Sequence, residues 1–168
     1  MPISPYIRAL RARVGPARLL LPSVAALVYD EAGGLLLVRQ SDGGVWSTPG
    51  GVIEPDETPA DAVVRETWEE TGLWVEPRRI EGVYGGPEFI VRYPNGDESQ
   101  YVIITFECAV RAGHLRPDKE ETLEARFWMS EEAATLPLAS WLRPVLSTFY
   151  THSASTDFAS PSWHPPIT

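Results

Sequence analysis

The chain has 168 residues, of which 43% are hydrophobic and 22% are charged. This length and composition suit one compact domain with its own core, and they exclude a disordered chain. Because 23 acidic side chains outnumber 14 basic ones, the net charge of −9 repels polyanions, and we expect no general nucleic-acid binding. Cys108 is the single cysteine, which excludes an intrachain disulfide and favours a cytoplasmic protein.

The first predicted elements are a short helix and two buried strands. Ser4 and Pro5 have the chemistry of a helix start, and Gly15 ends a helix predicted over 5–14. Aliphatic runs predict strands over 18–29 and 35–40, joined by a turn. The first run follows several arginines, but a proline interrupts it and it is too short to span a bilayer as a helix. We therefore expect no membrane association.

The best helical pattern of the chain lies over 59–71, where apolar and small side chains recur at three- and four-residue spacing. Thr58 is placed to cap this helix and Gly72 to end it. Ser130 is predicted to cap a short helix, and a last helix is predicted over 138–149. The remaining apolar runs predict strands over 73–85, 88–93, 101–110 and 125–129. Strands separated by these helices indicate an α+β fold with a mixed sheet in a single domain.

Three segments are expected along the chain. Residues 1–17 form an N-terminal helical extension, residues 18–150 form the main domain, and residues 151–168 form a flexible C-terminal tail. The tail is assigned because Ser, Thr, Pro and His replace the aliphatic periodicity there. Phe158 and Trp163 are aromatic residues within it that could dock on the body or on a second subunit.

Three carboxylates share one face of the predicted helix over 59–71. At about 100° per residue, Glu66, Glu69 and Glu70 fall within an arc of about 100°. Acidic runs on helices are often solvated faces, and like charges at this spacing destabilise an isolated helix. The preceding Gly50-Gly51 pair favours a different interpretation, because glycine lets the backbone approach a metal-bound phosphate. Oxygen ligands for a hard divalent cation beside such a loop indicate phosphoryl chemistry.

The segment from Gly51 to Leu73 resembles the signature box of the Nudix hydrolases. Every fixed charged and glycine position of that pattern is filled: Gly51, five residues, Glu57, seven residues, and then Arg65-Glu66-Thr67-Trp68-Glu69-Glu70-Thr71-Gly72-Leu73. The one departure is Thr67, where the family usually has an aliphatic residue, and we expect a slight packing cost from it. The resemblance covers roughly residues 20–136 and is to MutT-like members, including bacterial ADP-ribose pyrophosphatases.

This resemblance implies an α/β/α sandwich that hydrolyses a nucleoside diphosphate linked to another moiety, with Mg²⁺ or Mn²⁺ as cofactor. The implied metal ligands are the carboxylates of Glu66, Glu69 and Glu70 and the carbonyl of Gly50. Arg65 and Glu57 are implied to pair and to anchor the loop on the helix, and Gly72 completes the structural residues of the box. The base that activates water stays open between Glu66 and an acidic loop that contains Glu120, Glu121 and Glu124.

Substrate recognition is the least defined part of the prediction. Arg39 and Gly51 are expected to approach phosphate and Trp46 to stack on a base, although Arg39 could instead form a surface ion pair and Trp46 could be a core residue. Pro87 lies near the position where a proline is typical of ADP-ribose hydrolases, which favours ADP-ribose or a nucleotide sugar. The alternatives are a hydrolase that removes non-standard nucleoside triphosphates and a non-catalytic nucleotide sensor. A homodimer is left open, because the face of Tyr6 could pack on a partner.

Overall fold

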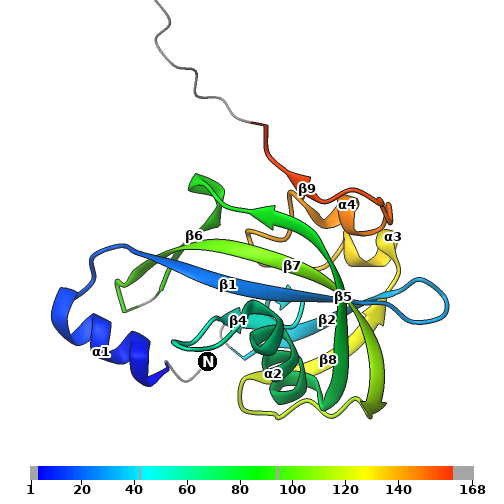
Figure 1. Ribbon diagram of the computed structural model, residues 1–168, viewed down its shortest axis with the longest axis horizontal. Helices are drawn as coiled ribbons and strands as arrows, with labels where there is room; N and C mark the ends of the chain where they lie inside the picture. Colours follow the sequence, from blue (N-terminus) through cyan, green and yellow to red (C-terminus); the bar gives the residue numbers. More distant parts are fainter. Residues whose placement is uncertain (1–3, 42, 94, 161–168) are drawn as a thin grey trace, which may run out of the picture.

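The computed structural model describes residues 4–41, 43–93 and 95–160 (Figure 1). The elements follow in chain order: α1 (Pro5–Val14), β1 (Leu19–Val28), β2 (Leu35–Gln40), β3 (Trp46–Ser47), β4 (Gly50–Val52), α2 (Pro59–Thr71), β5 (Leu73–Tyr84), the 3₁₀ turn η1 (Pro87–Phe89), β6 (Ile90–Arg92), β7 (Glu98–Gly113), β8 (Thr122–Trp128), α3 (Ser130–Ala133), α4 (Leu146–Phe149) and β9 (Asp157–Phe158).

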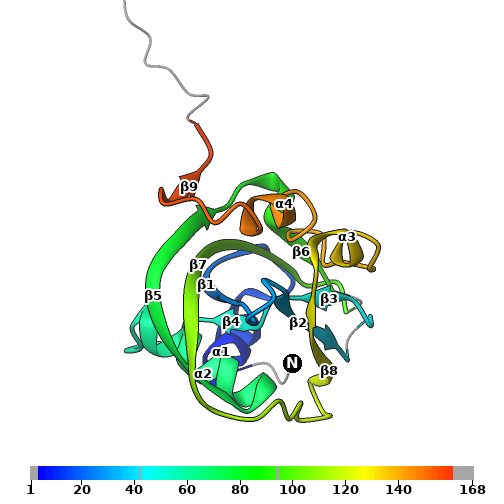
Figure 2. The same cartoon turned by 90° about the vertical axis from the view of Figure 1, so that its right-hand side faces the viewer.

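The strands form two sheets that curve around a shared interior. The larger sheet has the order β4-β1-β7-β5-β9, with β6 pairing β7, and the smaller sheet has the order β3-β2-β8. Because β1 pairs β7 in parallel and β5 pairs β7 antiparallel, the larger sheet is mixed. Figure 2 shows β1, β5 and β7 curving on one side and β2 and β8 on the other, with α3 and α4 at one end. The predicted α+β fold with a mixed sheet in one domain is confirmed.

Two hydrophobic cores lie on opposite faces of the larger sheet. Successive side chains of a strand point to opposite faces, so β1 contributes Ala25 and Leu27 to one core and Val24 and Ala26 to the other. The first core fills the space between the two sheets and the C-terminal turns. The second core lies under α2, which buries Val63 completely. Residues 23–28 are therefore buried on both faces because both faces of the sheet are covered there, whereas Leu20 near the start of β1 is exposed.

The C-terminal part of the domain differs most from the sequence prediction. The helix predicted over 138–149 is wrong, because within it only Leu146–Phe149 is α-helical. Leu138 instead forms a bridge with Trp46 of β3, and Ala139 donates its N–H to the Trp46 carbonyl at 2.8 Å. Pro144 also lacks an N–H and disfavours helical geometry in the residue before it. Strand pairing with β3 thus replaces the first turns of the predicted helix.

Smaller differences occur at three element ends. The strand predicted over 125–129 begins at Thr122, and the strand predicted over 88–93 is reduced to β6 because η1 takes up its first residues. Met129 occupies the N-cap of α3, with Ser130 as its first helical residue. The helices predicted over 5–14 and 59–71 are confirmed with the same bounds.

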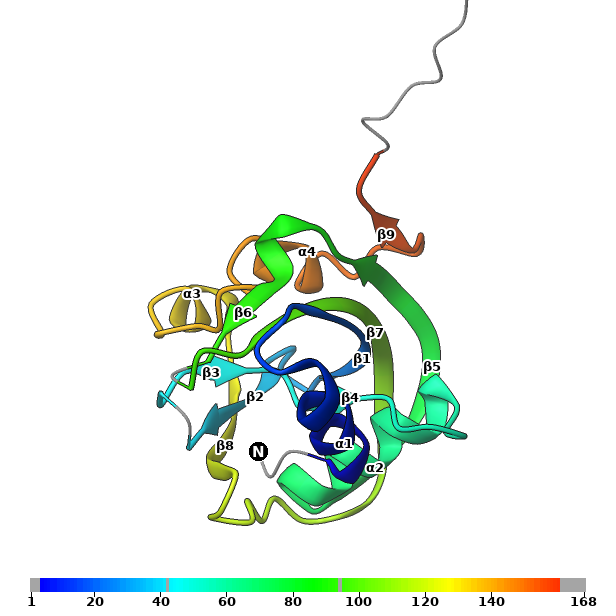
Figure 3. The ribbon, with the colours of Figure 1, turned by 90° about the vertical axis from the view of Figure 1, so that its left-hand side faces the viewer.

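The two terminal segments contact the larger sheet. Figure 3 looks onto α1, where Arg11 donates to the carbonyl of Glu98 at 2.6 Å and to the hydroxyl of Ser99 at 3.0 Å. At the other end, β9 pairs in parallel with β5, and the Tyr84 hydroxyl donates to Asp157 at 3.0 Å. Part of the segment predicted as a flexible tail is thus placed on the sheet, while Trp163 lies outside the described residues. The segment boundaries 1–17, 18–150 and 151–168 stay predictions.

Candidate active site

The helix α2 begins and ends where its sequence signals place it. The Thr58 hydroxyl accepts the N–H of Asp61 at 3.1 Å, and Pro59 occupies the first turn, where its missing N–H costs nothing. Gly72 ends the helix with φ 72°, a left-handed geometry that glycine adopts without strain. A Cβ at Gly72 would also lie 2.9 Å from the carbonyl oxygen of His114. These caps fix which side chains of α2 face the sheet.

Thr67, the departure from the box pattern, is fully buried in α2. Its hydroxyl donates to the carbonyl of Val63 at 2.6 Å, one turn earlier in the same helix. A buried hydroxyl that is hydrogen-bonded within its own helix leaves no unpaired polar group in the core. The helix therefore keeps its register although a threonine replaces an aliphatic residue.

Two of the three box carboxylates are buried and one is exposed. Glu66 is 7% exposed and Glu70 is 3% exposed, whereas more than half of the Glu69 side chain is exposed. Burial raises the pKa of Glu66, although Arg65 acts in the opposite direction. Burial also raises the pKa of Glu70 well above its usual value, despite a hydrogen bond of 3.0 Å from the Gly50 N–H. The site thus concentrates acidic groups whose charge is costly without a cation.

Arg65 connects the box carboxylates to the preceding loop. Its guanidinium forms two hydrogen bonds with the Glu57 carboxylate, at 2.7 and 2.9 Å. The same guanidinium lies 2.8 Å from a Glu66 oxygen and 3.2 Å from a Glu69 oxygen, and it donates to the Val52 carbonyl at 3.2 Å. Arg65 lowers the pKa of Glu57, which favours the charged form of the pair. The geometry agrees with a structural role for Arg65 and Glu57.

The two glycines of β4 bring the strand close to its neighbours. A Cβ on Gly50 would contact the carbonyl of Val24 and lie 2.8 Å from the Cα of Ala25, both on the adjacent strand β1. A Cβ on Gly51 would lie 2.5 Å from the Cδ of Glu66. Gly51 therefore provides space for a box carboxylate. Its predicted approach to substrate phosphate stays a prediction.

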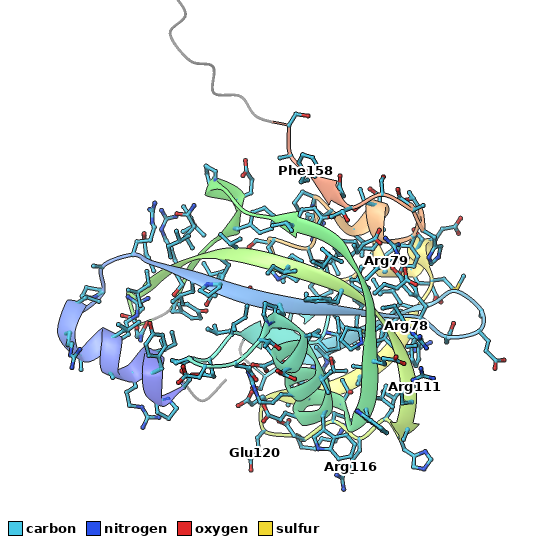
Figure 4. All side chains as sticks on the ribbon, viewed as in Figure 1. Arg78, Arg79, Arg111, Arg116, Glu120 and Phe158 are labelled. Carbon is cyan, nitrogen blue, oxygen red and sulfur yellow. The ribbon has the colours of Figure 1, made fainter. Side chains whose placement is uncertain are left out.

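The acidic loop before β8 brings one glutamate close to the box. The Asp118 carboxylate accepts three backbone N–H groups, those of Glu120 at 3.0 Å, Glu121 at 3.0 Å and Thr122 at 2.8 Å. Glu121 is half-buried, and its charge contributes to the raised pKa values of both Glu66 and Glu70. Glu120 is exposed and projects outward at the lower edge of the molecule (Figure 4). The structure therefore favours Glu121 over Glu120 as the loop glutamate beside the box.

Arg39 and Trp46 lie where the alternative interpretations put them. Arg39 on β2 forms an ion pair of 3.4 Å with Glu124, its partner across the strand pairing with β8. Trp46 is 5% exposed and packs edge to face against Trp128, with ring centroids 5.2 Å apart. The geometry supports a surface ion pair for Arg39 and a core position for Trp46. Their predicted roles in substrate binding stay predictions.

The chemistry of the donors fits a hard divalent cation. Glu66, Glu69 and Glu70 offer carboxylate oxygens, and the buried charges of Glu66 and Glu70 are of the kind that a bound cation stabilises. In the described part of the chain, no three His, Cys, Asp or Glu side chains are already arranged around a metal position. The reason is visible in the contacts, since Arg65 holds Glu66 and Glu69. Metal binding would require these carboxylates to turn from Arg65 towards the ion.

The amino-acid sequence is similar to those of MutT-like proteins. A MutT-like protein of Streptomyces ambofaciens is 38% identical over 117 residues, which are 70% of this chain and 68% of that protein. A Bacillus subtilis protein named provisionally as an 8-oxo-dGTP diphosphatase is 40% identical over 104 residues, 62% of each chain. The chain thus spans roughly two thirds of the length of these relatives.

A solved structure and a family model extend the agreement to the fold. The crystal structure of an ADP-ribose pyrophosphatase from Streptococcus suis matches with a TM-score of 0.66 at 25% identity, covering 82% of this chain and 96% of that one. The NUDIX domain model matches residues 19–149, which include the glycine loop, the capped helix and all box carboxylates. The chain therefore belongs to the Nudix hydrolase family.

Proposed function

We propose that this chain hydrolyses the pyrophosphate bond of a nucleoside diphosphate linked to another moiety. Mg²⁺ or Mn²⁺ would be held by the carboxylates of Glu66, Glu69 and Glu70 and by the carbonyl of Gly50. The observation that carries the proposal is the burial of Glu66 and Glu70 beside the glycine strand β4, with Arg65 binding the same cluster. A purely structural acidic helix has no need to bury two carboxylates whose pKa values are raised by that burial.

The reaction joins water to a phosphorus atom that carries negative oxygens. When bound, the divalent cation neutralises that charge and lowers the pKa of a bound water molecule. Arg65 holds the loop of Glu57 against α2, which keeps the ligand carboxylates on one side of the site. Glu121 would accept the proton of the attacking water at its carboxylate, with Glu66 as the alternative base; this role is supported by the contribution of the Glu121 charge to the raised pKa values of Glu66 and Glu70. Attack breaks one phosphoanhydride bond and leaves two phosphate-containing products.

The favoured substrate is ADP-ribose or a related nucleotide sugar. This choice is supported by Pro87, which begins η1, and by the similarity to the Streptococcus suis ADP-ribose pyrophosphatase. A hydrolase that removes non-standard nucleoside triphosphates is the second candidate, favoured by the similarity to the Bacillus subtilis relative. The net charge of −9 argues against RNA as substrate.

The deciding experiment measures product release from a panel of substrates with Mg²⁺ or Mn²⁺. The panel contains ADP-ribose, nucleotide sugars, dinucleoside polyphosphates, nucleoside triphosphates and oxidised triphosphates, each tested with wild type and with Glu69→Gln. Because the Glu69 side chain is mostly exposed, the variant should stay folded while turnover falls by orders of magnitude. Cleavage by Glu69→Gln at the wild-type rate would contradict the metal-ligand assignment. No cleavage of the panel, with metal still bound, would favour a nucleotide sensor.

Two further parts of the prediction accompany this function. We propose a cytoplasmic enzyme, consistent with the single cysteine. No helix in the described ranges is long and apolar enough to cross a membrane.

A homodimer remains a proposal as well, and α1 packs partly on its own domain because Ile7 is buried there. Light scattering on a chain lacking residues 1–15 tests it, because an unchanged dimer would exclude α1 from the interface.

A further inference from the structure

Two exposed tryptophans lie side by side near the box. Trp68 on the outer face of α2 is 48% exposed, and Trp74 at the start of β5 is 54% exposed. Both line one surface hollow of about 640 Å³. Exposing so much of two indoles is unfavourable in water, and neither belongs to the core under α2, which buries Ala62, Val63 and Thr67 instead. The fold itself therefore does not explain these two side chains.

The size and lining of this hollow suit a nucleoside. Pockets for small ligands occupy roughly 300–1,000 Å³ and combine apolar walls with few polar groups. Here Val64 and the two tryptophans supply apolar walls, and Glu57, Asp61 and Arg65 supply charged groups. Indole faces stack on nucleobases of any sequence, and carboxylates accept hydrogen bonds from ribose hydroxyls and exocyclic amines.

The hollow borders the candidate active site at Arg65 and Trp68. Arg65 lines the hollow and at the same time contacts Glu66 and Glu69. Trp68 also lines a second hollow of about 370 Å³, whose other residues include Glu69, Arg116 and Asp118. Figure 4 shows Arg116 at the lower edge of the molecule, near the end of α2. A ligand with its phosphates at Glu69 thus has an aromatic surface immediately beside it.

We propose that the hollow between Trp68 and Trp74 binds the nucleobase of the substrate, while the box binds its pyrophosphate. This inference rests on the proposed function and adds the residues that recognise the base. The base stacks on the exposed face of Trp68 or inserts between the two indoles, and Asp61 and Glu57 accept hydrogen bonds from the nucleoside. A second copy of this chain covering the same apolar surface is the competing explanation.

The test measures ligand binding separately from hydrolysis. Calorimetry on the full chain with Mg²⁺ compares AMP, which carries a base, with ribose 5-phosphate, which does not. Trp68→Ala and Trp74→Ala should each raise the Kd for AMP about tenfold, because one stacked base contributes an affinity factor of about this size, and should leave ribose 5-phosphate unchanged. Phe158→Ala removes an aromatic ring that is more exposed than either tryptophan, from β9 at the opposite edge of the molecule, and should change neither Kd (Figure 4).

Several outcomes would overturn the proposal. The proposed base site would be contradicted if AMP fails to bind wild type at millimolar concentration. It would also be contradicted if AMP binds the tryptophan variants as tightly as it binds wild type. Light scattering that shows Trp68→Ala converting a dimer to a monomer, with unchanged AMP binding, assigns the surface to a second copy. AMP that inhibits hydrolysis noncompetitively places its base outside the substrate site.

The failure of this inference is distinguishable from failure of the proposed function. Tryptophan-dependent AMP binding without hydrolysis of any substrate in the panel would contradict the proposed function alone. Hydrolysis that depends on Glu69 but whose KM is the same in wild type and Trp68→Ala would contradict the base site alone.

Discussion

The helix α2 and the segment over 138–149 both cover cores of the same domain, yet only α2 is helical over its whole length. In α2 the cap at Thr58, the terminal Gly72 and the spacing of buried residues all favour one helix. In the segment over 138–149 the apolar spacing favours a helix, but Leu138 forms a bridge with Trp46 and only the last residues become helical. Spacing alone is therefore decisive only where the backbone has no competing partner.

The largest effect should come from closing the space beside β1. Gly50→Ala should destabilise the fold by about 3 kcal/mol or more, because its Cβ meets backbone atoms of Val24 and Ala25, which cannot turn away. Gly51→Ala should cost about 1–2 kcal/mol, because its Cβ meets the Glu66 side chain, which can move. Urea unfolding measures both. If both variants lose the same free energy of unfolding, the whole strand β4 moves to accommodate either Cβ.

The C-terminal core can be tested in the same way. Leu142 is fully buried among the turns that replaced the predicted helix, so Leu142→Ala should lower the free energy of unfolding by about 2–4 kcal/mol. Leu20→Ala is the matched control, since Leu20 is 67% exposed and should change stability by less than about 0.5 kcal/mol. A loss at Leu142 no larger than the control would mean that the segment after α3 packs loosely in solution.

The effect of Mg²⁺ on stability tests the proposed ligands of the box. At a Mg²⁺ concentration about 100 times its Kd, the wild type should gain about 2.7 kcal/mol, visible as a higher melting temperature. Glu70→Gln should lose most of this gain, yet the metal-free variant should be at least as stable as wild type because a buried charge is removed. Differential scanning calorimetry with EDTA and with Mg²⁺ reports both. A full Mg²⁺ response in Glu70→Gln would remove Glu70 from the ligand set.

The smallest effect concerns the ion pair of Glu57 with Arg65. Because the pKa of Glu57 is lowered in the folded protein, its contribution to stability is present above the unfolded value of about 4.3 and is lost as pH falls through the folded pKa. The contribution should be about 1 kcal/mol or less, since both side chains are partly exposed. Unfolding of wild type and Glu57→Gln between pH 3 and pH 7 should show a difference that narrows towards low pH. If the difference in free energy of unfolding between the two proteins widens towards low pH instead, the charged form of Glu57 destabilises the fold.

Local signals in the amino-acid sequence are enough to identify the box and its helix. Caps, helical spacing and the separation of charged residues are local properties, so their pattern alone assigns Arg65, Glu66, Glu69 and Glu70 to one helix. The α+β class follows from the order of strand and helix signals in the same way. These features depend on backbone preferences that act over a few residues.

Contacts between distant parts of the chain depend instead on the folded arrangement. Folding places Arg39 against Glu124, brings Glu121 rather than Glu120 towards the box, and sets Trp68 beside Trp74. It also replaces the first part of a predicted helix by pairing with Trp46. Except for Trp68 and Trp74, these contacts join residues far apart in sequence, and their free energy depends on burial and geometry that exist only after the chain has folded.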